Sequence, residues 1–157
     1  MAEVIDTTDT TVSADIDDAK SYNPKHSIGG LLSRVKMRMM DALDAELEPY
    51  GISSAQYVIL VNLAGGVDSA SGLCRTVSYD PGAMTRMIDR LEKKRFVRRV
   101  PCPDDRRVMR LALTEEGKKV YPQLVERATK VMNDRLRGFT PGEVGQLERF
   151  LERMLAD

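Results

Sequence analysis

Small, hydroxyl and cationic side chains are grouped in one short segment of this chain, from Pro81 to Lys94. Small residues open the segment, and Thr85 and Arg86 follow them. A helix that binds DNA presents its first residues to the base edges, where threonine can bond a base and arginine can hold guanine or a phosphate. The segment therefore has the chemistry of a DNA-recognition helix. The predicted contacts are Arg75, Pro81, Gly82, Ala83, Thr85, Arg86, Asp89, Arg90 and Lys94.

The same residues have an alternative interpretation, which is an ordinary solvated helix face. Asp89 and Lys93 lie four positions apart and could form an intrahelical ion pair. The segment alone does not decide between the two interpretations.

A second cationic group favours DNA. Arg106 and Arg107 lie in a polar turn between two short β-like runs, residues 96–100 and 108–113. Arginine at the tip of a thin β-ribbon suits insertion into the minor groove, where the negative potential is enhanced. Asp105 is two residues from Arg107, on the same side of an extended ribbon. We predict that Asp105 orients the Arg107 guanidinium toward DNA. A solvated charged turn is the alternative.

Charge is distributed unevenly along the chain. The 24 basic and 24 acidic residues cancel overall. Residues 75–110, however, carry eleven bases against five acids, whereas residues 1–25 carry six acids against two lysines. Such asymmetry indicates a polyanionic partner at one face of the protein.

Apolar periodicity predicts the helices that hold these side chains. Apolar residues from Ile28 to Leu47 recur in steps of three and four, which indicates a long amphipathic helix. Ser53 and Gln56 form a capping box for a second helix, and a short helix follows over residues 70–77. Asp80 followed by proline starts the helix of predicted DNA contacts.

Two long helices are predicted near the C-terminus, capped by Thr114 and Thr140. The last of them has an apolar stripe from Val144 to Leu155. This stripe and that of the first helix have no internal partner large enough to cover both. A second copy of the chain, and hence a homodimer, is the expected cover.

The predicted fold is mainly α with a small β-hairpin: a winged helix-turn-helix flanked by long dimerisation helices. Residues 51–114 are predicted to form the DNA-binding domain, and residues 25–50 and 115–157 the helical dimerisation region. Residues 1–24 are acidic and poor in large apolar side chains, which predicts a disordered arm. The arm is either a tail without function or a segment that reaches across the dimer partner.

The residues from Asp105 to Gly117 resemble the wing signature of the MarR family of transcriptional regulators, an Asp-x-Arg followed by Leu-Thr-x-x-Gly at fixed spacing. Residues 81–93 are similar to the recognition helix of that family, and residues 52–56 to the start of its second helix. The resemblance runs from about His26 to the C-terminus. It implies an obligate homodimer on a pseudo-palindromic double-stranded DNA operator, usually a repressor, that small aromatic or phenolic ligands release.

One residue departs from the family pattern. Arg95 stands where the family commonly has glycine after the recognition helix. Arginine there must either adopt a left-handed cap or end the helix differently.

The resemblance also implies ligand contacts at the start of the first helix. His26 and Arg34 are the candidates there, and Met37 and Tyr57 complete the predicted ligand-binding set. Each has an alternative: His26 as an ordinary helix-start residue, Arg34 in a salt bridge, and Met37 and Tyr57 in the core.

The sequence lacks the residue patterns typical of enzymes, metalloproteins and membrane proteins. A single histidine, no glycine-rich phosphate loop and no Ser/His/Asp arrangement argue against an enzyme. Cys74 and Cys102 form no CxxC, so neither a metal nor another cofactor is expected. With no signal peptide and no apolar run of about 20 residues, we expect a cytoplasmic protein without a membrane partner.

Two alternatives to a ligand-released repressor stay open, an architectural DNA-binding protein and a redox-responsive regulator without a small-molecule ligand. Neighbouring arginines could favour the thiolate of Cys102 and make it redox-sensitive. An inert surface thiol is the other interpretation of this cysteine.

Overall fold

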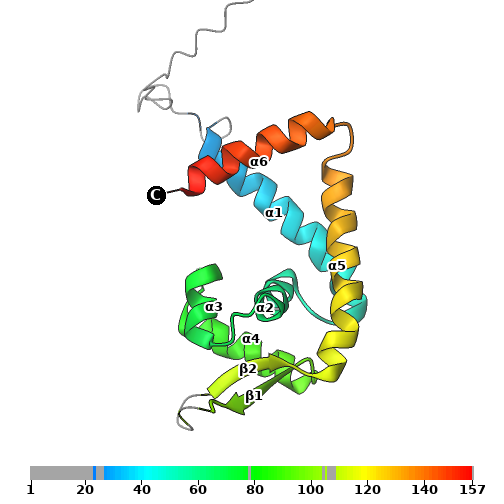
Figure 1. Cartoon of the computed structure of the whole chain (residues 1–157). Helices are drawn as coiled ribbons and strands as arrows, with labels where there is room; N and C mark the ends of the chain where they lie inside the picture. Colours follow the sequence, from blue (N-terminus) through cyan, green and yellow to red (C-terminus); the bar gives the residue numbers. More distant parts are fainter. Residues whose placement is uncertain (1–22, 24–26, 78, 104, 106–108, 157) are drawn as a thin grey trace, which may run out of the picture. The chain divides into compact units, whose positions relative to one another are not determined.

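Helices and one hairpin follow one another in the order that the sequence predicts (Figure 1). The computed structural model describes residues 23, 27–77, 79–103, 105 and 109–156. The fold class, mainly α with a small β-hairpin, is confirmed. The elements are α1 (Ile28–Leu47), the 3-10 turn η1 (Glu48–Tyr50), α2 (Ser54–Ala64), α3 (Ala70–Val77), α4 (Pro81–Lys93), β1 (Val97–Pro101), β2 (Met109–Leu113), α5 (Glu115–Arg135) and α6 (Pro141–Leu155).

The chain divides into two units, with the boundary between Lys36 and Met37 inside α1. In the first unit, the Gly30 N–H donates to the Ser27 hydroxyl at 3.1 Å, and the Leu31 N–H donates to the Ser27 carbonyl at 2.9 Å. Ser27 therefore caps the start of α1. Large apolar side chains exposed on this part of the helix are Ile28, Leu31, Leu32 and Val35.

Both predicted caps of the helix-turn-helix are present in the second unit. The Gln56 N–H donates to the Ser53 hydroxyl at 3.3 Å, and the Ser53 N–H donates to Gln56 Oε1 at 3.0 Å. At the start of α4, the Ala83 N–H donates to the Asp80 carboxylate at 2.9 Å. Pro81, at the first helical position, has no N–H to satisfy. These caps fix where α2 and α4 begin and hence which face of each helix turns inward.

Aliphatic side chains from α2, α3, α4 and the hairpin form the core of the second unit, together with the end of α1 and with α5. Leu60, Leu73, Leu91 and Leu124 are completely buried. Burying one such side chain contributes about 1.5–3 kcal/mol. Because α4 buries its inner face in this core, its opposite face is left to solvent.

Strands β1 and β2 pair antiparallel, with Val97 opposite Leu113 and Pro101 opposite Met109. The strands lie within one residue of the two runs predicted from the sequence. Side chains two residues apart in a strand share a face. Val97 is buried and Arg99 is half-buried, so both lie on the face of β1 that meets α4.

The hairpin is also attached to the connection between α2 and α3. The Leu111 N–H donates to the Asp68 carbonyl at 2.7 Å. The Arg110 guanidinium lies 3.0 Å from the Asp68 carboxylate. One aspartate thus holds β2 through both its backbone and its side chain.

Helix α4 ends in a left-handed residue, Arg95, with φ of 61°. The Arg95 N–H donates to the Glu92 carbonyl at 2.9 Å, and the Phe96 N–H donates to the Leu91 carbonyl at 3.0 Å. This pair of bonds defines a Schellman motif. Of the two conformations expected at this position, the left-handed cap is the one found. It costs an L-amino acid about 1–2 kcal/mol.

Replacing Arg95 with glycine is expected to raise the free energy of unfolding by about 0.5–1 kcal/mol, because glycine adopts this φ without steric penalty. Lys93→Gly is the matched control, since Lys93 lies in the last turn of the same helix. There glycine should lower the free energy of unfolding by about 1 kcal/mol. Urea unfolding at one protein concentration measures both. Equal destabilisation of the two variants would show that Arg95 carries no strain.

A tight junction joins the hairpin to α5. The Thr114 N–H donates to the Phe96 carbonyl at 3.0 Å, and the Thr114 hydroxyl donates to the Arg95 carbonyl. The same hydroxyl accepts the Gly117 N–H at 3.0 Å and caps α5. A Cβ at Gly117 would lie 2.1 Å from the Phe96 carbonyl oxygen. The spacing Thr-x-x-Gly is therefore required by the close approach of α5 to the start of β1.

Helix α5 runs through Pro122 without a break. Helix α6 starts at the predicted cap, Thr140, which forms a capping box with Glu143. None of the described residues of α6 is buried in the chain. Within the part of the chain that the structure describes, no helix is long and apolar enough to cross a membrane. The large apolar side chains exposed on α6 are Leu147, Phe150, Met154 and Leu155.

Candidate nucleic-acid interface

The first turn of α4 is exposed and built from small residues. Pro81 and Gly82 are exposed, and Ala83 is half-buried. A Cβ at Gly82 would lie 3.5 Å from a guanidinium nitrogen of Arg86. That is an ordinary van der Waals distance, whereas the Asp80 carboxylate would lie closer, at 3.1 Å. Small exposed residues with the Arg86 guanidinium beside them thus form the start of α4, and small side chains there allow close approach to a polyanion.

Thr85 and Arg86 lie next on this surface, and both are exposed. The Thr85 hydroxyl donates to the Pro81 carbonyl at 2.8 Å, which leaves its oxygen lone pairs and its methyl group available to a partner. Arg90 and Lys94 are exposed further along the helix, and Arg75 is exposed on α3. The structure thus brings cations from α3 and α4 to the surface of the helix-turn-helix.

Asp89 has a different environment from these residues. Its carboxylate lies 2.6 Å from the Arg99 guanidinium on β1, and Arg99 also pairs with Glu92. The Arg99 N–H donates to Glu92 Oε1 at 3.2 Å. The sequence offered Lys93 as the ion-pair partner of Asp89, and that alternative is wrong.

Arg99 therefore connects α4 to β1. The hydrogen bond to Asp89, followed by the negative charges of Glu92 and Asp89, raises the pKa of the Arg99 guanidinium despite partial desolvation. Because both carboxylates are engaged by one guanidinium, their negative charge on α4 is partly compensated. A DNA contact from Asp89 stays a prediction.

The tip of the wing carries predicted contacts that the structure describes only in part. Asp105 is exposed. Arg106 and Arg107 lie outside the described residues, so the orienting role of Asp105 stays a prediction. Cys102 has only 5% of its surface exposed, which corrects the expectation of a surface thiol. Burial removes the easy access that a redox sensor requires.

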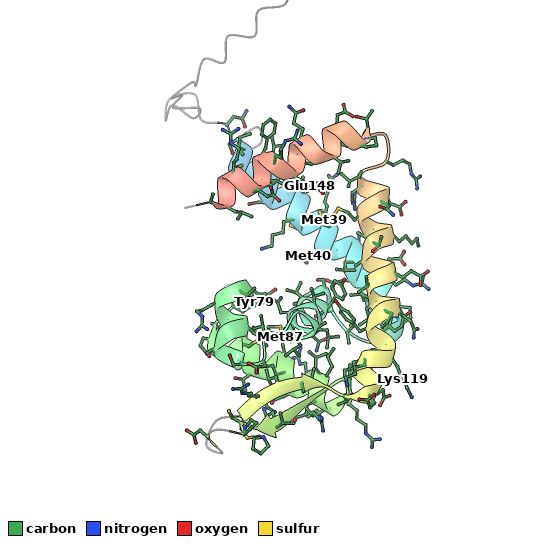
Figure 2. The ribbon with its side chains drawn as sticks, viewed as in Figure 1. Met39, Met40, Tyr79, Met87, Lys119 and Glu148 are labelled. Carbon is green, nitrogen blue, oxygen red and sulfur yellow. The ribbon has the colours of Figure 1, made fainter. Side chains whose placement is uncertain are left out.

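An apolar cavity of about 290 Å³ lies among α1, α2 and α5 in the second unit. Met39 and Met40 come from α1 (Figure 2), and Tyr57 from α2. Burial, followed by the proximity of Tyr121, raises the pKa of the Tyr57 phenol, which is therefore protonated at neutral pH. The lining residues are Met39, Met40, Leu43, Tyr57, Val58, Ala128, Val131 and Met132.

Of the other predicted ligand contacts, none lines this cavity in the described structure. Met37 is 58% exposed, so its assignment to the core of the chain is wrong. Arg34 belongs to the first unit, and His26 lies outside the described residues.

Sequence reasoning missed two structural connections at this site, those of Arg99 and Asp68. A usable signal existed for Arg99, because it lies two residues after the buried Val97 and shares its strand face. No comparable signal existed for Asp68, whose partner Arg110 is 42 positions away in the chain.

Comparison with known proteins identifies the family. A sequence model described as MarR family matches residues 50–108. The multiple antibiotic resistance protein MarR of Salmonella typhimurium is 30% identical over 136 residues, which cover 85% of this chain and 94% of that protein. The chain belongs to the MarR family.

Solved structures of the MarR family share the fold. A mutant of MarR from Escherichia coli, in complex with operator DNA, is 30% identical with a TM-score of 0.73, over 82% of this chain and 93% of that one. CouR from Rhodococcus jostii, bound to p-coumaroyl-CoA, is 28% identical with a TM-score of 0.75, over 85% of this chain and 95% of that one. The winged helix-turn-helix is thereby confirmed as the fold of this MarR-family chain.

Proposed function

We propose that this MarR-family protein is a homodimeric transcriptional repressor. It binds a pseudo-palindromic operator through α3, α4 and the hairpin, and a small molecule releases it from the DNA. The observation that carries the proposal is the exposed first turn of α4, where Gly82, Thr85 and Arg86 form a cationic end of a capped helix. The similarity to a MarR structure in complex with operator DNA supports it.

The recognition helix is positioned for the major groove in this proposal. The N-terminal residues of such a helix contact base edges, and two copies related by a two-fold axis meet half-sites about one helical turn apart. Arg86 supplies base or phosphate contacts, and Thr85 supplies a hydroxyl and a methyl group. Arg99 fixes the hairpin against α4, so that helix and wing approach the duplex as one body.

Arg86→Ala is expected to weaken operator binding by roughly 1–3 kcal/mol and to relax base preference, because the side chain lies at the reading end of α4. Lys94→Ala is the matched control, since Lys94 is exposed at the far end of the same helix. It should weaken binding to all sequences alike and reduce the salt slope by about one. Titrations of operator and random DNA at several salt concentrations measure both effects. Equal affinity of the wild type for operator and random DNA at physiological salt would refute specific repression.

The small-molecule part of the proposal is supported by the cavity among α1, α2 and α5. Its lining is apolar apart from the protonated phenol of Tyr57, which can donate one hydrogen bond. An aromatic or phenolic molecule satisfies such a lining, because ligand sites combine apolar walls with few polar groups. The cavity residues belong to α1 and α5 as well as to α2, the helix that packs against α4. A ligand bound in this cavity can therefore move α2 and, through it, the recognition helix α4.

A further inference from the structure

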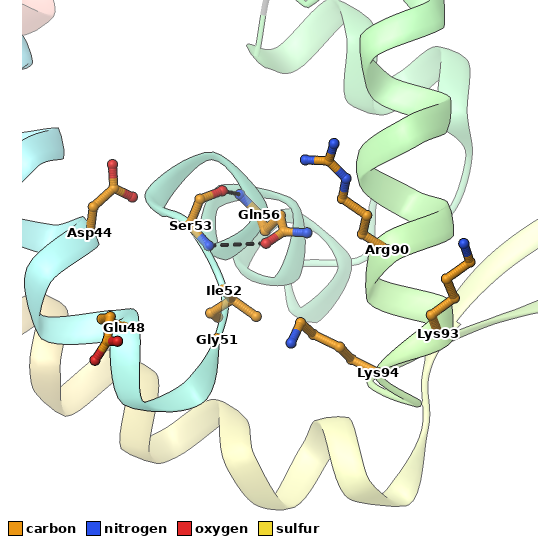
Figure 3. A pocket seen from close by; sticks show the side chains of 9 residues that line it. All are labelled: Asp44, Glu48, Gly51, Ile52, Ser53, Gln56, Arg90, Lys93 and Lys94. Carbon is orange, nitrogen blue, oxygen red and sulfur yellow. Dashed lines mark hydrogen bonds between the residues drawn. The ribbon is translucent and has the colours of Figure 1, made fainter.

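A second hollow, of about 690 Å³, lies between the start of α2 and the C-terminal end of α4 (Figure 3). It is bounded by the end of α1, the start of α2 and the C-terminal end of α4. It shares no lining residue with the apolar cavity. The lining residues are Asp44, Glu48, Gly51, Ile52, Ser53, Gln56, Arg90, Lys93 and Lys94.

One wall of this hollow is basic. Arg90, Lys93 and Lys94 all come from the last turn of α4 or the residue after it. Among the described residues, none of these three side chains has an ion-pair partner. Three cations beside one concave surface attract an anion, and their apolar stems leave room for an uncharged body next to it.

A largely buried amide adds a directed donor to the basic wall. Gln56 is only 6% exposed, and its Oε1 is already used by the Ser53 N–H. Its Nε2 has no hydrogen-bond partner within the described part of the chain. Figure 3 shows this nitrogen on the side of the hollow that faces Arg90 and Lys94. No buried side-chain nitrogen or oxygen of the described residues lacks a partner, so this nitrogen reaches solvent in the hollow, and a ligand acceptor there could take the place of water.

The opposite wall is acidic. Asp44 and Glu48 lie across the hollow from the three cations (Figure 3). The Ser54 N–H donates to Asp44 Oδ1 at 2.5 Å, which holds that carboxylate in place. Glu48 has no partner among the described residues. The lining residues from the α1 side thus carry two negative charges, and those from α4 carry three positive charges.

We propose that this hollow binds a small zwitterion, with its carboxylate on Arg90, Lys93, Lys94 and Gln56 Nε2 and its ammonium group on Asp44 and Glu48. A simple anion would face the two acids without compensation, and a simple cation would face the three bases. A molecule with both charges satisfies both walls.

The site has a regulatory consequence that rests on the proposed function. Arg90 and Lys94 are also predicted DNA contacts, so a carboxylate held on them competes with a DNA phosphate. The zwitterion would therefore weaken DNA binding by occupying the cations themselves, without a shift of the recognition helix.

Titration calorimetry on the DNA-free protein tests the site apart from the proposed function. The probe is 4-(aminomethyl)benzoate, compared with 4-methylbenzoate and benzylamine at equal ionic strength. We expect the zwitterion to bind at least about tenfold more tightly than either single-charge analogue. Equal affinities for the three compounds, or no heat from any at millimolar concentration, would overturn the proposal, whatever the result with operator DNA.

Two isosteric variants test which side chains bind the carboxylate and which bind the ammonium group of the zwitterion. Gln56→Glu keeps the acceptor that the capping box needs but replaces the Nε2 donor with a carboxylate, and should lower zwitterion affinity about tenfold or more. Glu48→Gln should lower the affinity for the zwitterion but should not lower the affinity for 4-methylbenzoate.

The matched control is Glu143→Gln, the same kind of exchange in the capping box of α6. It should leave the affinity unchanged. Lys93→Gln provides a second test on the basic wall if Gln56→Glu fails to fold. Wild-type affinity in Lys93→Gln and in a folded Gln56→Glu would overturn the assignment.

Discussion

Gly117→Ala is expected to lower the free energy of unfolding by about 3 kcal/mol, an effect at the upper end for overpacking. The added Cβ would lie 2.1 Å from the Phe96 carbonyl oxygen and 3.0 Å from its carbon. Both are backbone atoms, so no side chain can rotate away. The same carbonyl accepts the Thr114 N–H at 3.0 Å, so moving it breaks the junction between the wing and α5.

Gly145→Ala is the matched control for this substitution. Gly145 lies inside α6, and the nearest atom to an added Cβ would be the flexible end of Arg149 at 3.6 Å. Alanine in a helix interior should therefore raise the free energy of unfolding by about 0.5–1 kcal/mol. Urea unfolding at a fixed protein concentration compares the two, because unfolding of a dimer depends on concentration. Wild-type stability in Gly117→Ala would contradict the close approach.

Local chemistry explains what could be predicted from the sequence. The caps at Ser53, Asp80, Thr114 and Thr140 each involve bonds within three residues, so their patterns are visible in the chain itself. The order of helices and the hairpin followed from these caps and from apolar periodicity. The signature Thr-x-x-Gly was noted only as a resemblance. Its cause, the Phe96 carbonyl at Gly117, needed the tertiary structure.

Burial and ion pairing were harder to predict, because both depend on contacts between distant segments. Cys102 lies in a basic, polar stretch that suggested an exposed thiol, yet the fold buries it. Met37 is apolar, which suggested a core position, but it lies between the stripe positions Val35 and Met39 of its helix and is exposed. Lys93 lies four residues from Asp89 and was the expected partner, but Asp89 pairs instead with Arg99 of β1. A bidentate arginine held by two carboxylates prevails over a flexible lysine on a solvated face.

Phe150→Glu in α6 is expected to dissociate the proposed homodimer. Phe150 is 48% exposed in the single chain, and no described residue of α6 is buried. An exposed amphipathic helix at the end of a small chain requires a partner surface, and a second copy supplies it symmetrically. A glutamate inside such an interface is a buried charge without a partner, which costs several kcal/mol.

Arg149→Glu separates this effect from a general effect of charge. Arg149 neighbours Phe150 in the chain but points about 100° away around the helix, on its polar face. Its reversal changes the net charge by more than Phe150→Glu does, yet should leave the dimer intact. Sedimentation at micromolar concentration measures the difference. A monomeric wild type, or a dimeric Phe150→Glu, would contradict the assignment of α6 to the interface.

Loss of the dimer should also abolish tight operator binding, although α6 carries none of the predicted DNA contacts. In a dimer the second recognition helix binds at the effective concentration set by the first, which strengthens binding about 100-fold or more. A monomer retains one helix and one wing, so its contacts with a single half-site are unchanged. Phe150→Glu should therefore lose affinity for the full operator while binding an isolated half-site as the wild-type subunit does. If it lost half-site binding as well, the substitution would have unfolded the DNA-binding domain, and α6 would belong to the core of the chain instead of a dimer interface.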